Sequence, residues 1–180
     1  MKLELRHLAP YLPYGFKIFV DSDGFLQNDE TFEVNAITQN GVNVSTKRFP
    51  FNTDYSFDEF KIILRPLSDL TKEIEINGEQ LMPLEKLGQE FIQDGFYEDG
   101  VFGWGQSTGG GDEQDYSLTI VKENGNLNFN IWYGNEFENG YVVQETPLNY
   151  YYTTKLLEMH FDIFNLIKNN LARDINTINQ

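Results

Sequence analysis

Alternating apolar and polar positions predict several short antiparallel strands along this chain. The clearest pattern covers residues 127–131, where leucine, phenylalanine and isoleucine alternate with asparagines. Successive residues of a strand lie on opposite faces, so this run places its three apolar residues on one buried face. A second apolar run, residues 118–122, precedes it at the distance expected for a hairpin partner. Further strands are predicted at residues 16–20 and 60–64.

Asn-Gly pairs between apolar runs predict where these strands turn. Both residues tolerate the positive φ that a type I′ hairpin turn requires. The sequence contains four such pairs: Asn40-Gly41, Asn77-Gly78, Asn124-Gly125 and Asn139-Gly140. We therefore expect a mainly antiparallel sheet that is built from Asn-Gly hairpins.

Helical periodicity is strongest near the end of the chain. A long helix is predicted over residues 153–173 and a short one over residues 84–93. In the long helix the apolar stripe would occupy roughly one third of the circumference, while Asp162 and its polar neighbours lie opposite. The stripe comprises Leu156, Leu157, His160, Ile163, Phe164, Ile167 and Leu171. The pattern predicts an α+β fold in which both helices pack on the sheet, within a single domain over residues 1–180.

A glycine-rich segment separates the two halves of the chain. Five glycines occur within residues 103–111, and acidic residues follow. Because glycine is conformationally permissive, we expect a mobile surface loop over residues 103–115.

Composition narrows the function classes. The chain has 28 Asp and Glu against 13 Lys and Arg, a formal net charge of -15, which disfavours direct binding to nucleic acid. It has no cysteine, which excludes disulfides and thiolate chemistry. No stretch approaches the roughly 20 apolar residues of a membrane span, and charges interrupt the first residues. We expect a cytoplasmic protein that does not enter a membrane.

The acidic charge concentrates in residues 85–115, where eight acids accompany a single lysine and several aromatic residues. Tyrosine and tryptophan often anchor interfaces, while charge steers the encounter, so this segment predicts a binding surface for a basic protein. The residues assigned to this surface are Glu90, Asp94, Phe96, Tyr97, Glu98, Asp99, Phe102, Trp104, Asp112, Glu113 and Asp115. The alternative is that the aromatic residues form core and the acids only keep the protein dissolved.

Imidazole chemistry has little support in this sequence. His160 is expected on the buried stripe of the long helix, and Asp162 would project about 200° away, too far to orient it as in a catalytic dyad. His7 would share a strand face with Leu3 and Leu5. Structural roles are therefore predicted for both histidines, and no catalytic residue is assigned.

Phosphate and calcium sites are also disfavoured. Gly103-x-Gly105 lacks the third glycine of a dinucleotide-binding fingerprint. Asp23-Gly24 lies in a segment with calcium-loop spacing, but Phe19 stands at the first ligand place, so a tight turn is favoured. No metal ion or cofactor is assigned.

An enzyme built on carboxylates is the rival hypothesis. Glu59-x-Lys61 with an upstream acid resembles the acid-x-Lys element of restriction-type nucleases, although such short patterns are common. The residues that a metal-dependent hydrolase would use are Asp21, Asp23, Asp54, Glu59 and Lys61. The net charge would repel a nucleic-acid substrate, so we favour a protein without catalytic activity.

Three stretches resemble a group of uncharacterised small proteins encoded by phages and prophages. They are residues 6–15 (RHLAPYLPYG), residues 63–70 (ILRPLSDL) and residues 160–176, which contain HFDIF, LI and DIN. The resemblance implies a phage or mobile-element origin and, with it, the cytoplasm of the host cell, but it supplies no activity and no functional residues.

These observations lead to one main hypothesis. A phage or mobile-element protein with this charge could bind a basic, nucleic-acid-handling host protein and act as an inhibitor or DNA mimic. A structural or assembly component of a phage is a further alternative. The identity of the partner and the oligomeric state are left open.

Overall fold

The computed structural model describes most of the chain. The described residues are 1–21, 30–45, 53–91, 96–98, 101–108, 112–123, 126–135, 142–147 and 150–178, and between residues 90 and 149 the description concerns the backbone. The chain divides into two compact units: Met1–Leu67 with Leu156–Gln180, and Ser68–Lys155. The single-domain expectation stays a prediction.

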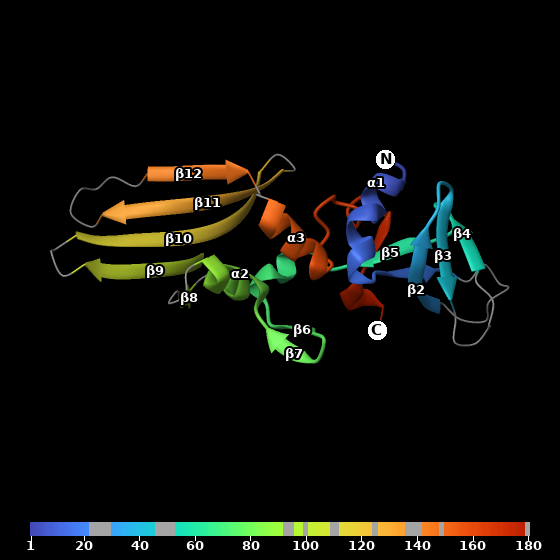
Figure 1. Cartoon of the computed structure of the whole chain (residues 1–180), viewed down its shortest axis with the longest axis horizontal. Coiled ribbons are helices and arrows are strands. Elements are labelled where there is room, and N and C mark those ends of the chain that lie inside the picture. Colours follow the sequence, from blue (N-terminus) through green and yellow to red (C-terminus); the bar gives the residue numbers. More distant parts are fainter. Residues whose placement is uncertain are drawn as a thin grey trace. The chain divides into compact units, whose positions relative to one another are not determined.

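The architecture is α+β with mainly antiparallel pairing (Figure 1). The first unit contains a six-stranded sheet in the order β13-β5-β1-β2-β3-β4, in which only β13 runs parallel to its neighbour. Its strands are β1 (Lys17–Val20), β2 (Glu30–Ile37), β3 (Gly41–Ser45), β4 (Thr53–Ser56), β5 (Lys61–Leu64) and β13 (Ala172–Asp174). The strands expected at residues 16–20 and 60–64 correspond to β1 and β5.

One face of this six-stranded sheet forms the core of the first unit. Ile18 pairs with Phe32 and Ile62, and all three are buried, because paired residues of adjacent strands lie on the same face of a sheet. A short helix α1 (Leu5–Leu8) and a 3-10 helix η1 (Ala9–Tyr14) contribute the fully buried Leu8 and Tyr11 to the same core. Pro10 lies in the first turn of η1, where its missing N–H costs little, and Pro13 lies inside this short helix.

The second unit contains a five-stranded antiparallel sheet in the order β12-β11-β10-β9-β8 and a separate hairpin, β6-β7. The five strands are β8 (Phe96–Glu98), β9 (Val101–Thr108), β10 (Asp112–Glu123), β11 (Asn126–Asn135) and β12 (Val142–Pro147). The hairpin consists of β6 (Ile74–Ile76) and β7 (Glu79–Leu81). The remaining helices are η2 (Leu67–Thr71), α2 (Pro83–Phe91), α3 (Tyr150–Glu158) and η3 (Ile175–Thr177).

The Asn-Gly pairs occupy different backbone positions. Asn77 and Gly78 connect β6 to β7, with positive φ values of 53° and 84°. Gly41 is instead the first residue of β3 and pairs with Ser56. The pairs at residues 124–125 and 139–140 lie outside the described part of the chain.

Strands occupy most of the segment, residues 103–115, for which a loop was expected. Residues 103–108 belong to β9 and residues 112–115 to β10, and these two stretches pair with each other. Residues 109–111 lie outside the description. Glycine disfavours an isolated strand, but pairing with β8 and β10 on both sides supplies ladder hydrogen bonds that local sequence cannot predict.

The long C-terminal helix predicted over residues 153–173 is wrong beyond residue 158. Helix α3 ends at Glu158, and the residues that follow form turns. His160, Asn165 and Asn170 have φ values of 59°, 60° and 58°, which are incompatible with a continuous right-handed helix. This segment therefore has apolar residues at helical spacing without helical geometry.

Asp162 explains part of this difference. Its carboxylate accepts hydrogen bonds from the backbone N–H groups of Leu166 (2.8 Å) and Ile167 (2.9 Å). Aspartate competes with helix formation in this way, by bonding to nearby backbone groups. The sequence pattern placed Asp162 on the polar side of a helix, whereas it is buried, at 5% exposure.

Candidate interaction surface

The pairing register of the five-stranded sheet separates its residues onto two faces. Leu118 of β10 pairs with Phe102 of β9 and with Ile131 of β11, and alternate residues along each strand share a face. The face that contains these three residues is called the apolar face. Its other aromatic and aliphatic members are Tyr97, Trp104, Tyr116, Ile120, Leu127, Phe129, Tyr133 and Val142.

The opposite face collects acidic residues and is called the acidic face. Among its described positions there is no lysine or arginine, Phe96 and Trp132 are the aromatic members, and small or amide residues occupy many of the others. The apolar face has a single described acid, Asp112, and a single described base, Lys122. The acids of the acidic face come from three strands and are Glu98, Glu113, Asp115, Glu123 and Glu145.

The residues that the sequence assigned to one binding surface therefore divide into separate groups. Phe96, Glu98, Glu113 and Asp115 belong to the acidic face. The members on the apolar face are Tyr97, Phe102, Trp104 and Asp112. Glu90 lies in α2, and Asp94 and Asp99 lie outside the described residues. Three of the four assigned aromatic residues and three of the four assigned acids that lie in described strands therefore belong to opposite faces.

Two acids were missed by the sequence analysis. Glu123 and Glu145 lie outside residues 85–115, yet the register brings them to the acidic face. The period-two alternation within β10 could have indicated Glu123. Glu145 could not be found in this way, because its position depends on how β12 pairs with β11.

Formal charge divides unequally between the two units. The second unit carries sixteen Asp and Glu against four Lys and Arg, a net charge of -12. The first unit carries twelve acids against nine bases, a net charge of -3. The acidic face thus belongs to the unit that carries most of the protein's negative charge, and its field will attract cations within a Debye length of about 10 Å at 0.1 M salt.

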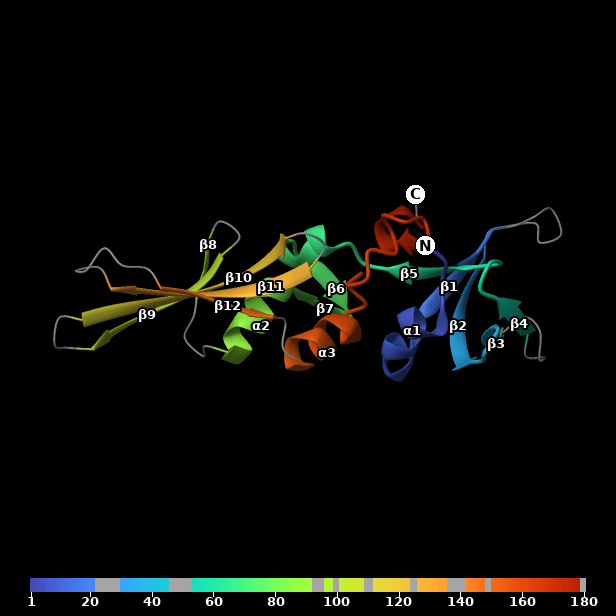
Figure 2. The ribbon, with the colours of Figure 1, turned by 90° about the horizontal axis from the view of Figure 1, so that it is seen from above.

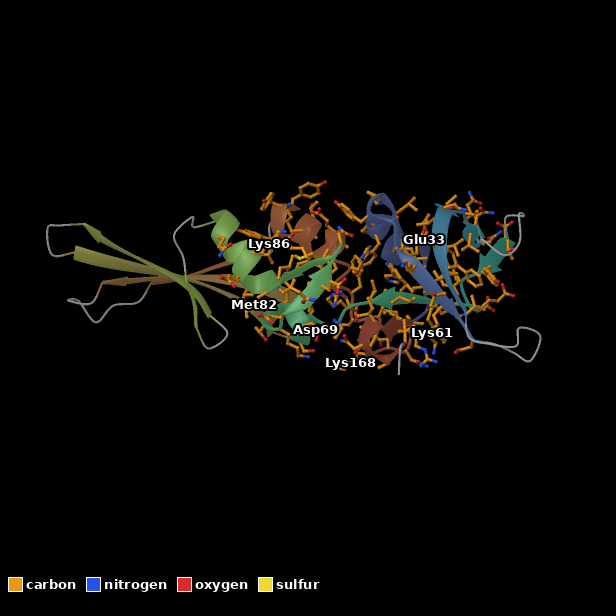
Figure 3. The ribbon with its side chains drawn as sticks, turned by 90° about the horizontal axis from the view of Figure 1, so that it is seen from below. Glu33, Lys61, Asp69, Met82, Lys86 and Lys168 are labelled. Atoms are coloured by element: carbon orange, nitrogen blue, oxygen red, sulfur yellow. The ribbon has the colours of Figure 1, made fainter. Side chains whose placement is uncertain are left out.

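Helix α2 lies close to β9, and Figure 2 shows it along one side of the five-stranded sheet. Its buried residues include Leu84, Leu87 and Gly88, whereas Lys86 and Gln89 are exposed. This spacing gives α2 one apolar stripe. Lys86 is one of the four bases of the second unit (Figure 3).

The carboxylates of the rival hydrolase hypothesis have separate partners. Asp54 on β4 accepts a hydrogen bond from the Asn43 side chain at 2.7 Å, and Asp21 forms an ion pair with Arg173 at 3.1 Å. Lys61 is on β5, which three strands separate from β4 in the sheet order. Asp23 lies outside the described residues.

Glu59, the remaining carboxylate that the hydrolase hypothesis would use, lies in the turn after β4. Glu59 accepts hydrogen bonds from the backbone N–H and the hydroxyl of Ser56, and these bonds lower the pKa of Glu59. Within the described part of the chain, no three histidine or carboxylate side chains are grouped as a metal ion would require. The pattern Glu59-x-Lys61 therefore marks a turn followed by a strand.

His7 belongs to a helical turn and not to the expected strand. It lies in α1, where its Nδ1 atom accepts a hydrogen bond from the backbone N–H of Glu4 at 3.1 Å. Burial lowers the pKa of His7, and the charge of Arg6 adds to this effect. The ring closes the start of α1, as capping side chains do.

His160 lies in the turn after α3 and is only half-buried. Burial lowers its pKa below the ordinary value of 6.5, and the charges of Arg65 and Lys17 act in the same direction, whereas a hydrogen bond with the Tyr14 backbone opposes them. Its Nε2 atom is buried without a hydrogen-bond partner. The neutral ring is therefore the form that this site favours.

This environment predicts a pH dependence of stability. The pKa of His160 is lower in the folded state than in the unfolded state. Its contribution to the free energy of unfolding is therefore fully present above pH 6.5 and is lost as the pH falls through the folded-state pKa. Urea unfolding on either side of pH 6.5 should show that His160→Gln loses less stability on acidification than the unsubstituted protein. The pH dependence of stability that remains in His160→Gln should include the contribution of His7. If the free energy of unfolding of His160→Gln falls with pH as steeply as that of the unsubstituted protein, His160 does not cause the pH dependence.

No helix in the described residues combines the length and apolar character needed to cross a bilayer. Comparison of the chain with protein-family models, curated proteins and solved structures gave no match. The resemblance to phage proteins stays a prediction, and a function must be inferred from charge and strand register.

Proposed function

We propose that this protein acts by binding a basic surface of another protein through the acidic face of its second unit. The observation that carries the proposal is the separation of five acids from most of the aromatic residues by strand register, within a unit of net charge -12. A one-signed face steers a partner of opposite charge and raises its association rate.

The chemistry of the two faces supports this choice of surface. Antiparallel sheets commonly bury one face and leave the other in water. The apolar face has the composition of a core, and α2 presents an apolar stripe that such a face can cover. The aromatic residues within residues 85–115 then serve mainly as core, and the acids supply the recognition surface.

A nucleic-acid-handling host protein is the partner that this chemistry fits best. The groove of such a protein is basic because it binds phosphates, so a face of carboxylates can occupy it in place of nucleic acid. The sequence resemblance implies that a phage or mobile element encodes this protein. The protein would then inhibit its host partner as a DNA mimic, by occupying the groove that binds nucleic acid. The activity requires no catalytic residue.

Capture of host proteins tests the proposal. We expect Glu113→Gln with Asp115→Asn to reduce recovery of a heparin-binding host protein about five- to tenfold, because both acids belong to the acidic face. The control, Glu73→Gln with Glu79→Gln, removes two exposed acids of the same unit at and near the β6-β7 hairpin. Recovery is measured by quantitative immunoblot on immobilised protein.

The controls give this experiment a clear interpretation. The control variant should recover the partner as the unsubstituted protein does, and duplex DNA should release the partner from both. Equal losses of partner recovery in the two variants would show that binding depends on net charge alone and not on the acidic face. Failure of duplex DNA to compete would contradict the mimic.

A further inference from the structure

A pair of exposed tyrosines begins helix α3 in the second unit. Tyr150 is 87% exposed and Tyr151 is 48% exposed, and Tyr150 is the most exposed large hydrophobic residue among those whose side chains the structure describes. Tyr152, next in sequence, is buried and holds its ring 5.4 Å from that of Tyr151 in an edge-on arrangement. The Tyr151 ring is thus held by a buried neighbour, while Tyr150 and about half of Tyr151 are exposed to water.

A lysine side chain of the same helix already lies over the ring of Tyr151. Lys155, four residues further along α3, places its Nζ atom 5.8 Å from the centroid of the Tyr151 ring. This distance is within the range in which an ammonium is attracted by the ring quadrupole. Residues four apart on a helix are neighbours, so Lys155 reaches the ring without distorting α3.

We propose that Tyr150 and Tyr151 form an aromatic anchor that binds an arginine or lysine side chain of the basic partner. This inference rests on the proposed function and names the residues that would give the contact its short-range specificity. The surrounding unit, at net charge -12, attracts cations, and Lys155 marks where one is accommodated. Tyrosine combines a large contact area with little conformational entropy, as interface anchors require.

Lys155 is then an internal competitor for the same ring. Its removal should help a basic ligand in two ways, by lowering the positive charge of the unit and by freeing the face of Tyr151. Lys86 separates these effects, because it is an exposed lysine of the same unit on α2 (Figure 3). Lys86→Ala removes the same charge and leaves the tyrosine pair unchanged.

The test uses a fluorescein-labelled oligoarginine peptide and fluorescence anisotropy with the full chain. We expect Lys155→Ala to bind the peptide about two- to fivefold more tightly than Lys86→Ala, the ratio that an exposed cation–π contact supports. In a Tyr151→Leu background the two lysine variants should bind equally, because the ring is absent. This double-mutant cycle isolates the contact from general electrostatics.

The outcomes separate the anchor from the proposed function. If Lys155→Ala and Lys86→Ala bind equally while Glu113→Gln with Asp115→Asn weakens binding, the anchor is wrong and the acidic face stands. If substitution of the two acids leaves peptide affinity unchanged but substitution of Tyr151 lowers it, the proposed binding role of the acidic face is wrong. Lys155→Gln and Lys86→Gln repeat the comparison if an alanine variant is less stable, as circular dichroism would show.

Discussion

Asp162→Ala is expected to lower the free energy of unfolding by about 2–4 kcal/mol. The carboxylate accepts hydrogen bonds from the backbone N–H groups of Leu166 and Ile167, and the first of these bonds is buried. Hydrogen bonds to a charged group contribute about 1.5–3 kcal/mol each, and removing the acceptor leaves the donors without a partner. Urea unfolding followed by circular dichroism measures the loss, and amide hydrogen exchange at the two donors localises it.

Asp174 provides a matched control for this substitution. It also accepts a backbone N–H, that of Asn176 at 2.9 Å, but this bond is exposed at the start of η3. Asp174→Ala should therefore cost only about 0.5–1 kcal/mol, as for a weakly stabilising cap. Equal losses in the two variants would refute the view that Asp162 organises the turn after α3.

Gly41→Ala is expected to destabilise the first unit by about 2–4 kcal/mol, although alanine is ordinarily the better residue in regular structure. A Cβ atom at Gly41 would overlap the carbonyl oxygen of Tyr55 and approach the Cα of Ser56. Both are backbone atoms of β4, so relief requires β3 and β4 to separate. The midpoint and slope of urea unfolding report the loss.

Gly78→Ala is the comparison for Gly41. Gly78 has a φ of 84° and nothing within 4 Å of the added Cβ, so it tests backbone strain without a clash. We expect a loss of about 1–2 kcal/mol, the ordinary penalty of an L-residue in this region. A Gly41→Ala protein as stable as Gly78→Ala would show that the two strands can separate freely.

Local patterning predicted strand positions better than helix length. The short apolar runs predicted as strands, residues 16–20 and 60–64, match β1 and β5 to within a residue, because such runs are typical of buried strands and Pro66 ends the second one. The segment after α3 has apolar residues at helical spacing as well. It nevertheless turns, since the hydrogen bonds of Asp162 and a parallel bridge between Arg65 and Phe161 replace those of a helix.

The candidate surface was predictable only in part. Counting charges shows that residues 85–115 are acidic, and that count needs no structure. Strand pairing puts Tyr97, Phe102 and Trp104 at register positions of the apolar face, which a count of charges cannot predict. Tyr151 was not singled out, because its exposure depends on which side of α3 is buried.

The acidity of the protein, its strand-forming segments and its mixture of helix and sheet follow from the amino-acid sequence alone, because they depend on composition and on short-range alternation. Only the tertiary structure decides which residues of the five-stranded sheet lie on each face. It also decides where α3 ends and that Asp162 is buried. Those features depend on strand register, on the local hydrogen bonds of Asp162, and on backbone hydrogen bonds that join Arg65 to His160 and Asp162. A shift of one residue in register would move every acid of a strand to the opposite face.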